Sequence, residues 1–295
     1  MTVNTNMNTN MNEIVGSHDL LLVTLDTCRH DVAVELLDAG RLPNLARVLP
    51  KDAGGRPYWE ERHTPGSFTF AAHAAFFAGF LPTPVAPGPH PRLFAARFGG
   101  SETTSPDTWV FDAPSLPEGL AKGGYHTACV GGVGFFNPAN PLGAVLPGLF
   151  HESHWSAQTS VASPTAFETQ IAKARSIAGA LGPDRPLFLF VNVPTLHQPN
   201  WFHSEGARRD DSLPAKGDSR ASHAAALEHV DQHIRELFDV MTARRDCFAV
   251  VCSDHGTLYG EDGLFGHRVA HPLVWTVPYA QFVLSRRGDA RRHGE

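Results

Sequence analysis

The segment CFAVVCSDHGTLYGEDGLFGH, residues 247–267, indicates how the chain is built. It begins with a short apolar run that ends at Asp254 and His255, and a glycine-rich loop then leads to His267. An apolar run of this length, bounded by polar residues, is typical of a strand buried inside a parallel sheet. The segment therefore predicts a buried strand with a carboxylate and an imidazole at its carboxyl end.

Three more apolar runs have the same character: DLLLVTL (19–25), HTACVGG (126–132) and PLFLFVNV (186–193). Between such runs, residues 222–244 carry apolar side chains at the spacing of one helix face, and residues 164–182 have the pattern of a second helix. Strands that alternate with helices favour a parallel sheet with both faces covered. We therefore predict an α/β fold with a doubly wound, mostly parallel central sheet and helices on both faces.

The composition limits the class of protein. A chain of 295 residues with 42% hydrophobic residues can bury a substantial core. The formal net charge is −6 and there is no long basic run, so nucleic acid is not an expected partner. The four cysteines show no CxxC spacing, and we expect them to be reduced.

The start of the chain, MTVNTNMNTNMNEIVGS, lacks the basic and apolar blocks of a signal peptide, and no apolar run is long enough to span a membrane. We therefore expect a soluble, cytoplasmic protein without a membrane partner. Residues 1–16 and 285–295 offer little to bury and are expected to be disordered, which leaves 17–284 as a single domain. The long loops 83–108 and 200–221 are expected to border the substrate.

Two strands end in groups that suit a metal ion. In an open parallel sheet, ligands bind beyond the carboxyl ends of the strands. The run at 19–25 ends at Asp26, and the run at 247–253 ends at Asp254 and His255. If the two strands are neighbours, two carboxylates and an imidazole converge, a set that suits Zn²⁺, Mn²⁺ or Mg²⁺. The alternative is that each aspartate caps the turn or helix that follows it.

A threonine lies near the expected start of a helix in TPGSFTFAAHAAFFAGFLPT, residues 64–83. Free backbone N–H groups and the helix dipole at that position favour an anion, so Thr69 is a candidate nucleophile. His73, four residues on, shares its helix face. The alternative is that Ser67 or Thr69 is an N-cap and His73 a core histidine.

Two further histidines return to the same edge of the predicted sheet. His197 follows the apolar run at 186–193, and His267 follows the glycine-rich loop after His255. Each histidine taken alone is equally compatible with a solvated loop residue.

Taken in order, the blocks LLLVTLDTCRHDV, TPGSFTFAAHAAFFAGFLPT, GLAKGGYHTACVGGVGFF, PLFLFVNVPTLHQP, AALEHVDQHIRELFDVM and CSDHGTLYGEDGLFGH resemble the sulfatase-like branch of the alkaline phosphatase superfamily. They cover most of residues 18–284. The most specific part is a D-T-x-R start combined with S-D-H-G and a downstream G-H.

The resemblance implies a metal-dependent enzyme that acts on phosphate-, phosphonate- or sulfate-type esters. It implies that Asp26, Asp254 and His255 are metal ligands. Thr69 matches the nucleophile of the branch that uses threonine, as in phosphodiesterases and lipoteichoic acid synthases, and its oxygen is expected to join the metal ligands.

The resemblance also implies that His197 and His267 touch the substrate or a second metal. With His73 as a further candidate, they are expected to stabilise charge on the phosphoryl group or to protonate the leaving group.

The chain departs from the family pattern at several positions. The Cys-x-Pro-x-Arg signature of arylsulfatases is missing, which disfavours sulfate esters. Thr27 and Thr195 stand where many relatives have acidic residues. We therefore expect at least one divalent ion and leave a second one open.

The expected function is hydrolysis of a small phosphate, phosphodiester or phosphonate ester through a covalent threonine intermediate. Two alternatives remain open at this point. One is a phosphotransferase or mutase that uses the same site, and the other is a non-catalytic metal-binding domain.

Overall fold

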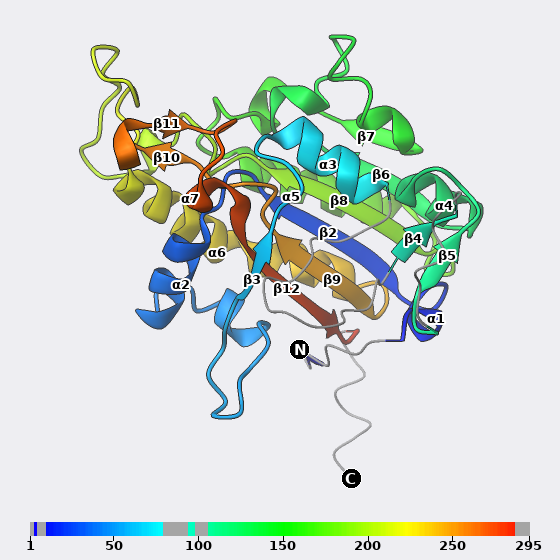
Figure 1. Ribbon diagram of the computed structural model, residues 1–295. Helices are drawn as coiled ribbons and strands as arrows, with labels where there is room; N and C mark the ends of the chain where they lie inside the picture. The colour runs from blue at the N-terminus through cyan, green and yellow to red at the C-terminus, as the bar shows by residue number, and fades with distance from the viewer. Residues whose placement is uncertain (1–2, 5–9, 79–93, 98–105, 287–295) are drawn as a thin grey trace.

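The computed structural model describes residues 3–4, 10–78, 94–97 and 106–286 of the chain (Figure 1). Its centre is a sheet with the strand order β1–β12–β9–β2–β8–β6–β7, and β3 also pairs with β12. The strands of this sheet are β1 (Val3–Asn4), β2 (Asp19–Leu25), β3 (Glu60–His63), β6 (His126–Val130), β7 (Glu152–His154), β8 (Leu187–Val193), β9 (Cys247–Cys252) and β12 (Thr276–Leu284). Two small ribbons stand apart, β4 (Phe94–Ala96) with β5 (Trp109–Phe111) and β10 (Leu258–Tyr259) with β11 (Phe265–Gly266).

The parallel part of the sheet consists of the strands that the sequence predicted. β9, β2, β8, β6 and β7 run parallel, whereas β12 runs antiparallel to β9. The four predicted apolar runs form β2, β6, β8 and β9, each within two residues of the expected bounds. The predicted α/β fold with a mostly parallel sheet is therefore confirmed.

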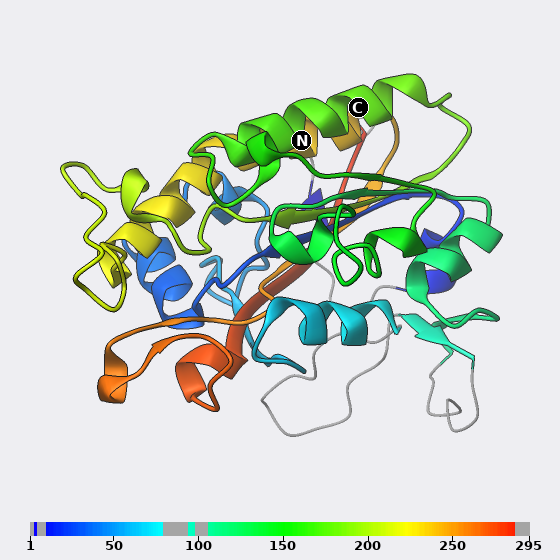
Figure 2. The ribbon, with the colours of Figure 1, turned by 90° about the horizontal axis from the view of Figure 1, so that it is seen from above.

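Helices cover both faces of the sheet, which explains why β2 is a continuous apolar run. Leu21, Val23 and Leu25 pack into the cluster that contains the apolar sides of α2, α5 and α6. Leu20 and Leu22 alternate with them and pack against α1, α3 and α4. Figure 2 shows α5 and α6 on one side of the sheet and α3 on the other.

The two helices expected from periodicity are α5 and α6, with slightly different bounds. The α-helices are α1 (Met11–Ile14), α2 (His30–Asp38), α3 (Thr69–Phe77), α4 (Leu116–Lys122), α5 (Ala166–Ala180), α6 (Arg220–Thr242) and α7 (Pro272–Trp275). The 3-10 helices are η1 (Leu45–Arg47), η2 (Gly134–Phe136), η3 (Pro147–Leu149), η4 (Ala157–Thr159), η5 (Trp201–His203) and η6 (Glu261–Gly263). α6 starts two residues before the expected bound because Ser219 and Ser222 form a capping box.

The prediction of disorder at the N-terminus is wrong for residues 10–16. They form α1 and the turn after it, and Met11 and Ile14 are buried in the core. β1 also pairs with β12. Residues 1–2 and 5–9 lie outside the described part of the chain.

The expected tail and the first expected loop lie mostly outside the described residues. Of the tail 285–295, only the first two residues are described, and the backbone N–H of Arg286 donates to Asp246 Oδ1 at 2.6 Å. In the loop 83–108, the described residues include β4. The loop 200–221 is described throughout and contains η5.

A buried ion pair ties the start of β2 to the end of α6. Arg244 Nε donates to Asp19 Oδ2 at 3.1 Å, and the side chains are 7% and 0% exposed. The other guanidinium nitrogens donate to backbone carbonyls that follow α5, including those of Leu181 and Arg185. One side chain therefore joins the two helices on this face to the sheet.

We expect Arg244→Met to lower the free energy of unfolding by about 3–5 kcal/mol, because it leaves the Asp19 carboxylate buried without its cation. Urea denaturation measures the change. Arg245→Met is the control, since Arg245 makes only exposed bonds to backbone carbonyls, and we expect it to change stability by no more than about 0.5 kcal/mol. Equal losses in the two variants would contradict a structural role for the buried pair.

Candidate active site

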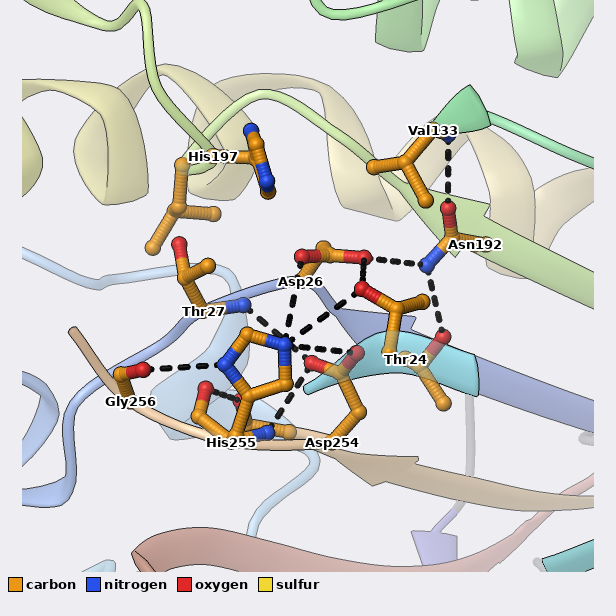
Figure 3. A network of polar contacts seen from close by, with 12 residues as sticks. Thr24, Asp26, Thr27, Val133, Asn192, His197, Asp254, His255 and Gly256 are labelled. Carbon is orange, nitrogen blue, oxygen red and sulfur yellow. Dashed lines mark hydrogen bonds and ion pairs between the residues drawn. The ribbon is translucent and has the colours of Figure 1, made fainter. Parts of the chain in front are cut away.

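The site lies beyond the carboxyl end of β2, between the ends of β9 and β8 (Figure 3). Thr24 of β2 lies opposite both Asn192 of β8 and Cys252 of β9. This register brings Asp26, just after β2, close to Asp254, just after β9. The convergence expected from the sequence is therefore present, and both carboxylates are fully buried.

The four expected metal-binding residues meet at this point. His255 Nε2 lies 3.4 Å from Asp254 Oδ2 and 3.9 Å from Asp26 Oδ1. Thr69 Oγ1 lies 3.4 Å from His255 Nε2 and 3.3 Å from Asp26 Oδ2. Each of the four residues is 1% exposed or less. Figure 3 shows the two carboxylates and the imidazole pointing toward one another.

Each carboxylate uses one oxygen within the protein and leaves the other free. Asp254 Oδ1 accepts from the backbone N–H groups of Thr27 and His255, at 3.2 and 3.0 Å. Asp26 Oδ2 accepts from Asn192 Nδ2 at 2.9 Å. Asp26 Oδ1 and Asp254 Oδ2 are buried and have no hydrogen-bond partner among the described residues. These are the two oxygens that face His255.

The tautomer of His255 places the free lone pair of its ring on the nitrogen that faces the two unpartnered carboxylate oxygens. His255 Nδ1 lies 2.9 Å from the carbonyl oxygen of Gly256, which only accepts, so Nδ1 carries the hydrogen. The lone pair is then on Nε2, the atom next to the two unpartnered oxygens. Two carboxylate oxygens and an imidazole nitrogen form a suitable donor set for a divalent cation.

The electrostatics favour the same conclusion. Burial, together with the charge of Asp254, raises the pKa of Asp26 to about 6. Burial also raises the pKa of Asp254 to about 7, and it lowers the pKa of His255. Two adjacent buried carboxylates are unfavourable unless a cation neutralises them, so the residues fit a bound metal ion.

Thr69 is the first residue of α3, as the sequence suggested, and its side chain faces this cluster. Phe68 before it is extended, so the helix starts abruptly beside the strand ends. A Cβ on Gly66 would lie 2.7 Å from the backbone nitrogen of Ala72, so only glycine allows the preceding turn to pack over the helix start. Residues 79–83 of the predicted helix segment lie outside the described residues.

His73 packs as a core histidine, the alternative that the sequence left open, and its expected catalytic role stays a prediction. Its Nδ1 lies 2.7 Å from the carbonyl oxygen of Thr69, and its Nε2 lies 2.9 Å from Thr24 Oγ1. The ring is fully buried against aromatic side chains, including Phe136 and Phe190. Burial lowers the pKa of His73 to about 3. Through these contacts, His73 links the first turn of α3 to β2.

Sequence reasoning missed Asn192, which connects the site to a second loop. Its Nδ2 donates to Asp26 Oδ2 and, at 3.3 Å, to Thr24 Oγ1. Its Oδ1 accepts from the backbone N–H groups of Gly132 and Val133, at 3.3 and 3.0 Å. The available signal was a polar side chain inside LFLFVNV, a strand that is buried on both faces.

His197 and His267 lie over the cluster and line a cavity of about 290 Å³ together with Thr69. The ring centroid of His267 is 4.6 Å from that of His255 and 5.3 Å from that of His197. Burial, with the charges of the two neighbouring histidines, lowers the pKa of His267 to about 3, so its ring is neutral at pH 7. The cavity also contains Arg268, a second residue that sequence reasoning missed.

Arg268 is held over the start of α3 by its backbone. Its φ is 68°, in the left-handed region, and its N–H donates to the carbonyl oxygen of Ser67 at 2.8 Å. Its guanidinium carbon lies 5.6 Å from the centre of the Phe68 ring. The signal for this residue was its position directly after His267.

The sequence left a second metal ion at this site open, and the described residues do not decide it. Thr27 and Thr195 carry hydroxyl groups where the family resemblance implies acidic residues, and both oxygens are buried without a hydrogen-bond partner among the described residues. The structure brings together one full set of acidic and imidazole ligands here, Asp26, Asp254 and His255, within the part of the chain that it describes.

No family model matches this chain, and no curated protein matches it. Solved structures do. The C-terminal periplasmic domain of EptC from Escherichia coli, in complex with Zn, has a TM-score of 0.58 at 14% identity over 98% of this chain and 78% of that chain. The lipoteichoic acid synthase LtaP from Listeria monocytogenes has a TM-score of 0.56 at 14% identity over 95% and 68%.

A protein in the alkaline phosphatase superfamily from Vibrio parahaemolyticus has a TM-score of 0.54 at 13% identity over 97% of this chain and 63% of that chain. At such identities the similarity establishes the fold alone. The chain has the alkaline phosphatase-like fold, which confirms the fold that the resemblance implied.

The expected cytoplasmic location is wrong in the light of these structures. The EptC structures from Campylobacter jejuni and Escherichia coli that share the fold are C-terminal periplasmic domains. Among the residues that the structure describes, no helix is both long enough and apolar enough to cross a membrane.

The raised carboxyl pKa values give a stability test in the presence of a chelator. A carboxyl whose folded pKa lies above its unfolded value makes the fold less stable as pH rises from the unfolded pKa to the folded one, so the metal-free chain loses stability between about pH 4 and pH 7. We expect Asp254→Asn to be more stable than the wild type by about 1–3 kcal/mol at pH 8. At pH 5 we expect a smaller gain, because Asp254 is then protonated in the fold but ionised in the unfolded chain, so only part of the loss has developed.

Urea unfolding at the two pH values measures this effect. Asp52→Asn is the matched control, because Asp52 Oδ1 also accepts from two backbone N–H groups but the residue is exposed. We expect no pH-dependent gain in the control. A loss of stability in Asp254→Asn at pH 8 would show that the buried carboxylates are not under electrostatic stress.

Proposed function

We propose that this chain is a metal-dependent enzyme that transfers the phosphoryl group of a phosphate diester through a covalent intermediate on Thr69. The observation that carries the proposal is the position of Thr69 Oγ1. It lies at the start of α3 and next to two buried carboxylates whose inner oxygens have no partner among the described residues.

Asp26, Asp254, His255 and the Thr69 oxygen are the residues that would hold the metal ion. When bound, a divalent ion would lower the pKa of the Thr69 hydroxyl and polarise an oxygen of the phosphoryl group. The donor set supports Zn²⁺ or a similar ion. The solved structure of similar fold in complex with Zn supports the same class of metal.

Thr69 would attack the phosphorus atom, so that a bond forms between Thr69 Oγ1 and phosphorus while the bond to the leaving oxygen breaks. The free N–H groups of the first turn of α3 stabilise negative charge at the attacking oxygen. His73 and Thr24 hold this turn in place through the Thr69 carbonyl.

His197, His267 and Arg268 would bind the phosphoryl oxygens and assist the leaving group. A neutral His267 can donate one ring hydrogen, and its Nδ1 is buried without a hydrogen-bond partner among the described residues. Among the residues that the structure describes, Arg268 is the one permanently cationic side chain lining this cavity, whose other walls include Val133, Phe135 and Leu142. A single fixed positive charge and an apolar wall suit a singly charged diester better than a doubly charged monoester.

A second cavity supports an alcohol acceptor over water. A cavity of about 700 Å³ lies on the other side of His197 and is lined by Trp201, Phe202 and Lys216, among others. Both cavities share His197, so an acceptor bound in the larger cavity would lie next to the cavity that contains Thr69. Hydrolysis, which sequence reasoning favoured, is the same reaction with water as the acceptor.

The structures of similar fold also favour transfer over hydrolysis, because EptC and EptA are phosphoethanolamine transferases. A non-catalytic metal-binding domain is a weaker alternative. It gives no reason for a threonine hydroxyl to be buried against the metal-binding atoms.

The test uses chromogenic aryl esters with Zn²⁺, Mn²⁺ or Mg²⁺, with and without glycerol as acceptor. We expect turnover of the phosphodiester, loss of activity with a chelator, little turnover of the sulfate ester, and a glycerol phosphodiester product. Thr69→Ala should lower kcat/KM by at least about 10³-fold, because it removes the nucleophile.

Thr69→Ser is the control, since it keeps a hydroxyl at the same position and should retain measurable turnover. Activity near the wild-type level in Thr69→Ala would exclude Thr69 as the nucleophile. Turnover that yields only the water product, at a rate independent of glycerol, would make the enzyme a hydrolase.

A further inference from the structure

A second group of metal-ligand side chains lies outside the candidate active site. Glu168 is in the first turn of α5, and His229 and His233 are four residues apart on α6. One ligand atom from each of the three lies within 4.8 Å of those of the other two. α5 and α6 pack side by side on one face of the sheet (Figure 2).

The free atoms of this cluster point to a missing ligand. Glu168 Oε2 and His229 Nε2 are buried and have no hydrogen-bond partner among the described residues. His229 Nε2 lies 3.2 Å from Glu168 Oε1, close but not in hydrogen-bond geometry, and His233 Nε2 lies 3.6 Å from the same oxygen. Two imidazole nitrogens crowd one carboxylate oxygen while the other oxygen stays free.

Two further side chains fit around this group. His233 Nδ1 lies 3.4 Å from Glu236 Oε1, so a hydrogen on Nδ1 leaves the lone pair of His233 on Nε2. The ring of His203 in η5 lies next to that of His229, with centroids 4.7 Å apart and an interplanar angle of 40°, and its Nε2 is also buried without a hydrogen-bond partner among the described residues.

Another histidine cluster of the described chain, around Glu152, has no such free atoms. Glu152 also lies between two histidines, but its Oε1 bonds to His126 Nε2 at 2.6 Å and its Oε2 bonds to His154 Nε2 at 2.9 Å. Both oxygens are therefore satisfied within the protein. The Glu168 cluster has the residue types of a metal site and also the free ligand atoms.

We propose that Glu168, His229 and His233 bind a second, separate Zn²⁺-class ion, with His203 as the fourth ligand. Two histidines and one carboxylate with one further ligand form a common tetrahedral zinc set, and histidines four residues apart on a helix meet on one face. The side chains of the three main ligands are 23–30% exposed, so an ion can enter from solvent.

The ion would fasten η5 to the two helices. η5 lies between His197, which lines both cavities beside Thr69, and the start of α6. Trp201 and Phe202 of η5 line the larger cavity. The site would therefore stabilise one wall of that cavity without taking part in the chemistry at Thr69.

The test measures metal binding in the Asp26→Asn/Asp254→Asn background, which removes the carboxylates of the candidate active site. The untagged, metal-free protein is titrated with Co²⁺, followed by its visible absorption, and with Zn²⁺ by equilibrium dialysis. We expect one ion per chain. Adding His229→Gln and His233→Gln should weaken binding by about 100-fold or more, because two ligands are lost.

His203→Gln in the same background should weaken binding by about 10-fold, because it removes one ligand of four. His126→Gln/His154→Gln is the control and should bind like the background. Circular dichroism checks that each variant is folded.

A background protein that binds no ion would overturn the proposal. Binding that survives the His229 and His233 changes, or that is weakened equally by the control, would overturn it as well. Because the background lacks the active-site carboxylates, the result does not depend on the proposed transfer activity.

Discussion

The structure depends on the burial of two carboxylates, Asp26 and Asp254, at the ends of adjacent parallel strands. Each would lose much of its hydration there, and each repels the other, so the arrangement is costly unless a cation lies between them. The protein satisfies the outer oxygen of each carboxylate with N–H donors and leaves the inner oxygens unpaired. His255 faces the same point with its lone pair. The electrostatic cost of this site is offset by a bound cation or, at lower pH, by protonation of the carboxyl groups.

Several layers of contacts keep Thr69 at this point. Asn192 links Asp26 to the loop after β6, and His73 links the first turn of α3 to β2 through Thr24. Arg268 closes the loop after His267 over the start of α3. These residues come from separate parts of the chain and hold the Thr69 oxygen, the proposed nucleophile, at a fixed place. Rigid placement of this kind is what an in-line attack requires.

The sequence predicted the parallel strands and Asp26, Asp254 and His255 because buried parallel strands are continuous apolar runs and because ligands bind beyond their carboxyl ends. Other features depend on packing between distant segments. The pairing of Asn192 with Asp26 requires the register of β8 with β2, and the burial of His73 requires the aromatic side chains around it. Glu168 meets His229 only because α5 packs on α6. The order of α1 likewise comes from the burial of Met11 and Ile14 in the core, which composition does not reveal.

The most direct measurement is the anomalous diffraction of crystals grown with Zn²⁺, recorded above and below the zinc absorption edge. If the buried carboxylates exist to hold a metal, a strong peak will lie between Asp26, Asp254 and His255, within about 2.0–2.2 Å of the ligand atoms and next to the Thr69 oxygen. Crystals of Asp26→Asn/Asp254→Asn should lack this peak. A zinc-saturated crystal with no peak at this position would contradict the metal centre and the chemistry at Thr69 that depends on it.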